Sequence, residues 1–147
     1  MARAQCIVHR GNRLLMVKHQ MNDEEWWCLP GGGIMEGEKP EQAAIRELKE
    51  ECCVEGNIIA EVSHNKYPAD SQSYTYIVDI GRQEPQLGVD PEFGVPILVD
   101  IAWFSLKEVP ERDRAFLWFS GLLAIPEFYS EVGQWGDDIS YPKDARR

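Results

Sequence analysis

Four consecutive apolar residues at positions 14–17, Leu-Leu-Met-Val, constrain the fold of this chain most strongly. Side chains of a β-strand point alternately to its two faces, so this run leaves neither face polar. A strand without a polar face belongs at the centre of a sheet that is covered on both sides. The sequence therefore predicts helices above and below a sheet.

Further elements are predicted around this central strand. Gly11-Asn12 is a two-residue turn signal, which predicts a hairpin between strands at residues 5–9 and 13–19. Other apolar runs predict strands at residues 26–29, 58–64, 74–80 and 97–104. Helical patterns predict helices at residues 40–52 and 112–125, the second from the spacing of Ala115, Phe116, Phe119, Leu122 and Leu123.

Length and composition indicate one domain over residues 1–147, because 147 residues with 44% hydrophobic content can build a core. The start of the chain is typical of a strand rather than a signal peptide, and no apolar run approaches the roughly 20 residues that cross a bilayer. We therefore expect a cytoplasmic protein without a membrane partner. The four cysteines form no CxxC pair, which predicts free buried thiols.

The net charge of −10 argues against a nucleic-acid polymer as a partner, since a phosphate backbone calls for a basic patch. A small phosphorylated ligand remains compatible with this charge, because bound magnesium inverts the local field. The polar tail at about residues 133–147 is punctuated by Gly and Pro. We expect it to be loose or to pack against a partner subunit in a homodimer.

Three carboxylates in the first predicted helix form the strongest functional pattern. Glu47, Glu50 and Glu51 stand at i, i+3 and i+4, so a helix brings them onto one face. Like charges that close repel each other unless a cation neutralises them, and magnesium prefers hard oxygen ligands. A neighbouring apolar stripe consists of Ala44, Ile45, Leu48 and Cys52. Ala43 falls within the acidic stripe, where its small size would leave room for a metal or phosphate.

The residues before and within this helix complete the pattern. Gly31, Gly32 and Gly33 allow the backbone to turn sharply and approach a ligand. Arg46 lies four residues before Glu50, which permits a charge-assisted contact. Lys39 stands where a hydrogen-bond-accepting cap is expected, so the cap is weak or comes from Glu38.

The spacing of these residues resembles the signature of the Nudix hydrolase family, whose members include MutT-like pyrophosphohydrolases. The matching residues are Gly32, Glu38 and the run Arg46-Glu47-Leu48-Lys49-Glu50-Glu51, within a signature at residues 32–54. Segments 29–33 and 103–108 are also similar to the family's flanking segments. One position departs, because Cys53 stands where the pattern has glycine. A left-handed cysteine costs roughly 1 kcal/mol or more, so we expect a shifted or strained helix end.

The resemblance implies an α/β (α+β) fold with a mixed central sheet sandwiched between helices. It also implies hydrolysis of a nucleoside diphosphate linked to another moiety, such as ADP-ribose, a nucleotide sugar or a nucleoside triphosphate. Glu47 and Glu51 would be the main Mg²⁺ ligands, Mn²⁺ being a possible substitute, and Glu50 would join them directly or through water. Arg46 would orient a glutamate, and Glu38 would support the loop. The substrate would lie at Gly31 to Gly33.

Two other functions remain open at this point. A catalytically silent Nudix-like nucleotide sensor would be expected to lack a helix carboxylate, and none is missing here. An acidic interaction module without a ligand predicts no magnesium binding at all.

Several other residues have both a functional and a structural interpretation. Glu92, on the long connection at residues 81–96, is either an additional metal ligand or general base that the loop brings to the substrate site, or an exposed acidic residue of a turn. Aromatic residues that face either a nucleobase or the core are Trp26, Trp27, Tyr74 and Tyr76. Residues that contact phosphate or are simply exposed on strands are Arg13, Lys18 and His19. Tyr67-Pro68 lies near a position that varies with substrate in the family.

Overall fold

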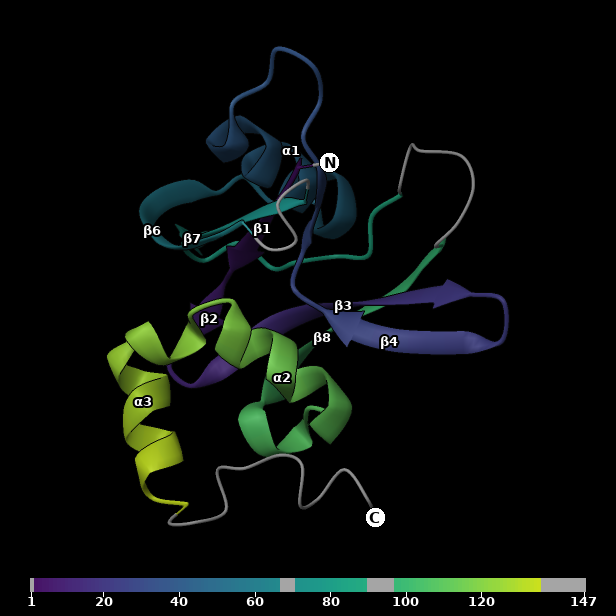
Figure 1. The fold of residues 1–147 in the computed structure, drawn as a ribbon. Coiled ribbons are helices and arrows are strands. Elements are labelled where there is room, and N and C mark those ends of the chain that lie inside the picture. The colour runs from purple at the N-terminus through teal and green to yellow at the C-terminus, as the bar shows by residue number, and fades with distance from the viewer. Residues whose placement is uncertain (1, 67–70, 90–96, 136–147) are drawn as a thin grey trace.

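The computed structural model describes residues 2–66, 71–89 and 97–135, with the side chains of residues 111 and 112 left aside (Figure 1). The predicted tail beyond residue 135 lies outside this range. The strands are β1 (Ala2–Ile7), β2 (His9–Arg10), β3 (Arg13–Met21), β4 (Glu24–Cys28), β5 (Gly31–Gly33), β6 (Asn57–Asn65), β7 (Gln72–Asp79) and β8 (Ile97–Ser105). The helices are α1 (Pro40–Cys52), α2 (Glu111–Phe119) and α3 (Pro126–Gly133), with single 3₁₀ turns η1 (Leu106–Glu108) and η2 (Leu122–Ala124).

The strands form two four-stranded sheets rather than one. The first sheet has the order β5-β1-β7-β6 and is mixed, because β1 runs parallel to β7 while the other pairs are antiparallel. In the second sheet β3 pairs antiparallel with β2, β4 and β8. The predicted hairpin at Gly11-Asn12 joins β2 to β3, and the predicted α+β class with a mixed sheet is confirmed.

The central strand β3 is covered on both faces, as its unbroken apolar run predicts. Leu14 and Met16 pack into a cluster with the α2 and α3 side chains, whereas Leu15 and Val17 pack into a second cluster with α1. Figure 1 shows α1 on one side of the strands and α2 and α3 on the other. The core therefore has two halves, and β3 separates them.

The prediction of a single helix over residues 112–125 is wrong for its second half. Helix α2 ends at Phe119, and Gly121 turns the chain with a φ of 88°, a left-handed conformation that glycine adopts freely. The chain then continues through η2 into α3, which the sequence pattern did not predict. Phe116 and Phe119, two of the residues whose spacing predicted this helix, are 68% and 59% exposed.

Helix α1 begins at Pro40 and ends at Cys52, as predicted. The Lys39 side chain makes no capping hydrogen bond; instead the Lys39 N–H donates to Oε1 of Gln42 at 2.9 Å. Ala43 is fully buried within the hydrophobic cluster rather than in an open acidic stripe. The small side chain of Ala43 therefore allows α1 to pack closely on the sheet. The prediction that it leaves room for a metal or phosphate is wrong.

The segment at residues 81–89 covers the C-terminal end of α1. The Gln86 N–H donates to the carbonyl of Cys52 at 2.9 Å, and the Gly88 N–H donates to the carbonyl of Glu51 at 2.8 Å. Carbonyls in the last turn of a helix have no partner within the helix, so these bonds satisfy two of them. A Cβ on Gly88 would overlap the Glu50 carbonyl, which restricts this position to glycine.

Cys53 closes α1 in a left-handed conformation, with φ 59° and ψ 35°. Its N–H donates to the carbonyl of Lys49 at 3.0 Å. The helix end is therefore strained but not shifted, because a side chain occupies a conformation that favours glycine.

Replacing this residue is expected to stabilise the protein. Cys53→Gly should raise the free energy of unfolding by about 1 kcal/mol, because it removes the left-handed penalty and the exposed thiol has no packing to lose. Urea denaturation measures the change. Asn22→Gly, at the other non-glycine residue with positive φ in the described ranges, is the control and should change less, since asparagine tolerates this conformation. A gain for Cys53→Ala as large as for glycine would contradict the argument.

The cysteines are free, as predicted, although only two of them are buried. Cys6 and Cys52 lie in the core, Cys28 is half-buried and Cys53 is exposed. Within residues 2–66, 71–89 and 97–135, no helix is long and apolar enough to span a bilayer.

Candidate functional site

The three carboxylates of α1 gather beside β5, but they differ in exposure. Glu51 and Glu47 are 1% and 4% exposed, whereas Glu50 is half-buried. The acidic stripe is therefore largely enclosed by the protein rather than lying open on the helix surface. Enclosure strengthens every charge interaction among these groups, because little water screens them.

Arg46 connects four carboxylate and carbonyl groups. Its guanidinium binds Glu38 through two bonds, Nε to Oε2 at 2.8 Å and Nη2 to Oε1 at 3.0 Å. The same group donates to Glu47 Oε1 at 3.0 Å and to both oxygens of Glu50 at 3.2 and 3.3 Å. Its last contact is with the Gly33 carbonyl at 2.9 Å. The predicted contact between Arg46 and Glu50 thus exists, within a wider network that fixes the loop to the helix.

The glycines of β5 let the backbone lie directly against these carboxylates. The Gly31 N–H donates to Glu51 Oε1 at 2.9 Å. A Cβ on Gly32 would lie 2.5 Å from Oε1 of Glu47, closer than real side-chain contacts. Glycine is thus required here for close approach of the backbone to a glutamate, where the sequence predicted close approach to a ligand.

His19 also reaches this cluster, although the sequence indicated only phosphate contact or simple exposure. His19 is buried, with 7% of its surface exposed, and its Nε2 lies 3.4 Å from Oε2 of Glu51. Burial disfavours the charged imidazole, but hydrogen bonds to Cys28 and Glu51 outweigh burial and raise the pKa of His19 to about 10. Alternation along β3 places His19 on the α1 side with Leu15 and Val17, and this was the signal for its inward position.

The donor set fits a hard divalent cation. Burial and the neighbouring Glu51 carboxylate raise the pKa of Glu47 to about 7, against the opposing effect of Arg46. This shift is the result of crowding negative charge in an enclosed site, and a cation would relieve it. In the described part of the chain, no three acidic, histidine or cysteine side chains converge as a finished metal cage. Magnesium commonly completes its shell with water and substrate oxygens, so the carboxylates need not form such a cage.

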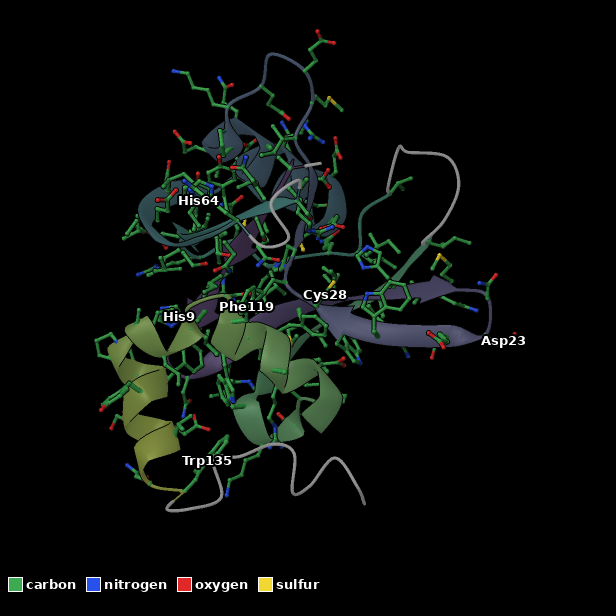
Figure 2. All side chains as sticks on the ribbon, in the orientation of Figure 1. His9, Asp23, Cys28, His64, Phe119 and Trp135 are labelled. Atoms are coloured by element: carbon green, nitrogen blue, oxygen red, sulfur yellow. The ribbon has the colours of Figure 1, made fainter. Side chains whose placement is uncertain are left out.

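A cavity of about 360 Å³, within the size range of small-molecule sites, lies on the α2 side of β3, and two of its lining residues, Trp26 and Cys28, contact His19 beside the cluster. It combines aromatic walls with polar groups from both sheets and α2. The lining residues are Arg3, Gln5, Met16, Trp26, Trp27, Cys28, Leu29, Asn65, Ser73, Asp113, Phe116, Leu117, Phe119 and Ser120. Figure 2 shows Cys28 at the end of β4, where the chain leaves for β5. The cavity therefore adjoins the segment that carries the three glycines.

The other predicted ligand contacts divide between the cavity and the packed structure. Trp26 and Trp27 line the cavity. Tyr76 is buried and donates to Glu41 at 3.1 Å, and Tyr74 stacks on His64 with ring centroids 4.0 Å apart. Arg13 is exposed on its strand, and Lys18 pairs with Glu25 at 3.1 Å. Glu92 and Tyr67-Pro68 lie outside the described residues.

Comparison with known families decides what kind of domain holds this site. The family described as NUDIX domain matches residues 1–120. The chain belongs to the Nudix family. The residues that carry the Nudix signature are therefore the ones that the structure gathers around Arg46, with Cys53 in place of the signature glycine.

Similar Nudix proteins support this assignment. An RNA pyrophosphohydrolase of Zymomonas mobilis is 39% identical over 110 residues, covering 63% of this chain and 70% of that protein. A nucleoside triphosphate pyrophosphatase/Nudix hydrolase fusion protein of Bifidobacterium longum is 29% identical over 86 residues, covering 58% of this chain but only 17% of that protein. The crystal structure of a NUDIX hydrolase from Nitrosomonas europaea has a TM-score of 0.64 at 20% identity, covering 76% of this chain and 61% of that one. The family match and the Zymomonas mobilis relative confirm the predicted family and enzyme class, a Nudix hydrolase, and the crystal structure confirms the fold.

Proposed function

We propose that this Nudix domain hydrolyses a diphosphate bond in a nucleoside diphosphate linked to another moiety, with magnesium as the cofactor. One observation carries the proposal: Glu47, Glu50 and Glu51 are held on one helix face by Arg46 and by the β5 backbone. Fixing three like charges at such distances has an electrostatic cost that a purely structural helix would avoid. A cation shared with a substrate diphosphate offsets that cost.

Some residues of this site would bind the metal, and others orient the residues that bind it. Glu47 and Glu51 would hold the metal, and Glu50, the most exposed of the three, would join directly or through water. Arg46 keeps Glu47 and Glu50 in place, and Glu38 keeps Arg46 in place. When bound, magnesium would supply Lewis-acid polarisation of the diphosphate and activate a water for in-line attack.

The loop before α1 is fastened by the same groups. Glu38 accepts the Met35 N–H at 2.9 Å in addition to the Arg46 guanidinium, and these two bonds lower the pKa of Glu38. With its pKa lowered, Glu38 favours the ionised form and binds Nε and Nη2 of Arg46. The Nη1 donor of Arg46 then faces the α1 carboxylates. The geometry of the metal-binding face is thus set before any ligand arrives.

The cavity between the strands and α2 supports a nucleoside as one half of the substrate. Its aromatic residues offer flat faces for a base, while Gln5, Asn65 and Asp113 offer hydrogen-bonding groups. Gln5 is itself fixed by bonds to Thr75 and Ser120, each at 2.9 Å, so its amide is preorganised. The cavity connects to the carboxylate cluster through Cys28, which lines the cavity and contacts His19 beside Glu51.

A substrate panel tests the proposed reaction. The panel contains ADP-ribose, a nucleotide sugar, a nucleoside triphosphate and a 5′-triphosphorylated oligoribonucleotide, the last because a similar protein is named as an RNA pyrophosphohydrolase. Each substrate is incubated with and without Mg²⁺, and release of phosphate and nucleoside monophosphate is measured. We expect magnesium-dependent cleavage of a small nucleotide and little cleavage of the RNA. Binding without turnover across the panel would replace this proposal with the sensor function.

A cavity variant separates the nucleoside site from general surface effects. Phe116→Ala should raise KM about tenfold and leave kcat within about threefold, because base–aromatic stacking is worth roughly 1–3 kcal/mol. Phe116 is 68% exposed, so its removal should cost little stability. The matched control is Tyr129→Ala, a 69% exposed aromatic on α3 that does not line the cavity. Equal KM values for the two variants would rule out this cavity as the base site.

Three further properties stay predictions: a single domain over residues 1–147, a cytoplasmic location and a homodimer. The role of Glu92 at the substrate site also stays a prediction.

A further inference from the structure

His19 lies between the α1 carboxylates and the wall of the cavity. It projects from β3 at the one point where the pairing of β3 with β8 is irregular: Lys18 pairs with Asp100, but His19 pairs with Leu98. Val99 is therefore an extra residue on β8, a β-bulge. Bulges re-aim neighbouring side chains and recur beside active sites. Because the extra residue lies on β8, the alternation along β3 is unbroken, and His19 faces the α1 side as Leu15 and Val17 do.

Every edge of the His19 ring has a partner. Nε2 lies 3.4 Å from Oε2 of Glu51, and Nδ1 lies 3.4 Å from Sγ of Cys28. The ring face stacks on Trp26, with centroids 6.1 Å apart and an interplanar angle of 27°. A carboxylate oxygen accepts hydrogen bonds, so Oε2 of Glu51 offers an acceptor to an N–H at Nε2. The orientation of the ring is thus fixed by contacts at both nitrogens and on one face.

We propose that His19 is a positioning residue that holds Oε2 of Glu51 while the Gly31 N–H holds Oε1. It also ties that carboxylate to the cavity, because Trp26 and Cys28 both line the cavity and both contact His19. A substrate that presses on either wall residue acts on the group that orients Glu51. This inference rests on the proposed function, since Glu51 is assigned its metal there.

The burial of Glu51 makes the contribution of His19 large. Its side chain is 2% exposed, so water cannot replace a lost donor at Oε2. Groups that hydrogen-bond a metal-ligating side chain typically change metal affinity or activity 10–100-fold when they are removed. We expect an effect of that size, without any contact between His19 and the substrate.

Two substitutions at this position test the proposal. His19→Phe keeps the ring and its stacking on Trp26 but removes both nitrogens, and should weaken Mn²⁺ binding 10–100-fold in the absence of substrate, measured by electron paramagnetic resonance. His19→Gln places an N–H near the position of Nε2 and should recover affinity to within about fivefold of wild type. The ring-for-ring control is His64→Phe on β6, which stacks on Tyr74 and should leave Mn²⁺ affinity unchanged. Unchanged affinity in His19→Phe, or no recovery with glutamine, would overturn the proposal.

A metal-free measurement keeps this inference separable from the proposed function. Long-range ¹H–¹⁵N NMR of the wild-type protein should show a protonated Nε2 at His19, and its signal should move in Glu51→Gln while the His64 signals stay in place. An Nε2 signal that ignores the Glu51 substitution would overturn the positioning role even in an active enzyme. If wild type bound no Mn²⁺ and cleaved no substrate, the proposed function would fail, while the NMR result would still decide the contact between His19 and Glu51.

Discussion

Glu51→Gln is expected to lower kcat about 1,000-fold, which corresponds to about 4 kcal/mol of transition-state stabilisation. Glutamine has nearly the same shape as glutamate, and its carbonyl can still accept the Gly31 N–H. It cannot supply the negative charge that a divalent cation requires, and its NH₂ group replaces the oxygen that faces His19. The loss should therefore appear in catalysis rather than in folding.

Stability provides the internal check for this variant. Glu51 raises the pKa of Glu47, so removing its charge relieves repulsion within the enclosed cluster, but the glutamine NH₂ then faces the Nε2 of His19. These two effects oppose each other, so the unfolding temperature of the metal-free protein should change by less than about 5 °C. Glu41→Gln is the matched control: it lies on the same helix, keeps an acceptor for Tyr76 and should retain activity within about twofold. A Glu51→Gln enzyme that turns over as fast as wild type would remove the basis of the proposed mechanism.

Arg46→Ala should destabilise the protein by about 3 kcal/mol at pH 8. The substitution leaves the carboxylates of Glu38, Glu47 and Glu50 without the guanidinium that joins them. Removing one partner of a buried charge pair costs about 3–5 kcal/mol. The lower end of that range applies because the Arg46 side chain is 21% exposed. Urea denaturation measures the loss. Lys49→Ala is the control on the same helix, since its pair with Glu55 is about two-thirds exposed and contributes less than about 1 kcal/mol.

The cost of Arg46→Ala should shrink at pH 5.5. Glu47 has a folded-state pKa raised to about 7, above its ordinary value of 4.5, so the folded state binds the proton more tightly and loses stability as the pH rises through this window. At pH 5.5 Glu47 is mostly neutral in the folded protein and no longer needs Arg46. Glu38, whose pKa is lowered, stays ionised and preserves part of the penalty. An equal loss at both pH values would show that Glu47 does not depend on the guanidinium.

Local signals account for the parts of the structure that the sequence predicted. Pro40 and the helical spacing of the glutamates predicted both ends of α1 correctly. The unbroken apolar run at positions 14–17 identified the strand that divides the core. The spacing of glutamates also identified the contact between Arg46 and Glu50, because residues four apart on a helix are neighbours. These features depend only on residues that are close in sequence.

The features that the sequence did not predict depend on residues far apart in the chain. Alternation puts His19 on the α1 side of β3 with Leu15 and Val17, but its contacts with Glu51 and Cys28 depend on α1 and β4, and no pattern within β3 records them. Ala43 and Glu47 lie at adjacent parts of α1 whose burial is decided by how β1 and β5 pack on the helix. The break at Gly121 was hidden because apolar residues continue on both sides of it with helical spacing. Periodicity describes one element at a time, whereas these positions are set by contacts between elements.

The segment at residues 81–89 has a consequence for changing the specificity of this enzyme by recombination. Its amides at Gln86 and Gly88 complete the last turn of α1, and Gly88 has no room for a side chain against Glu50. A loop taken from a relative would bring different spacing to those two amides and so disturb the helix that carries the glutamates. The segment and the end of α1 therefore form a single exchange unit, and a chimera should move them together or keep residues 86–88 as they are.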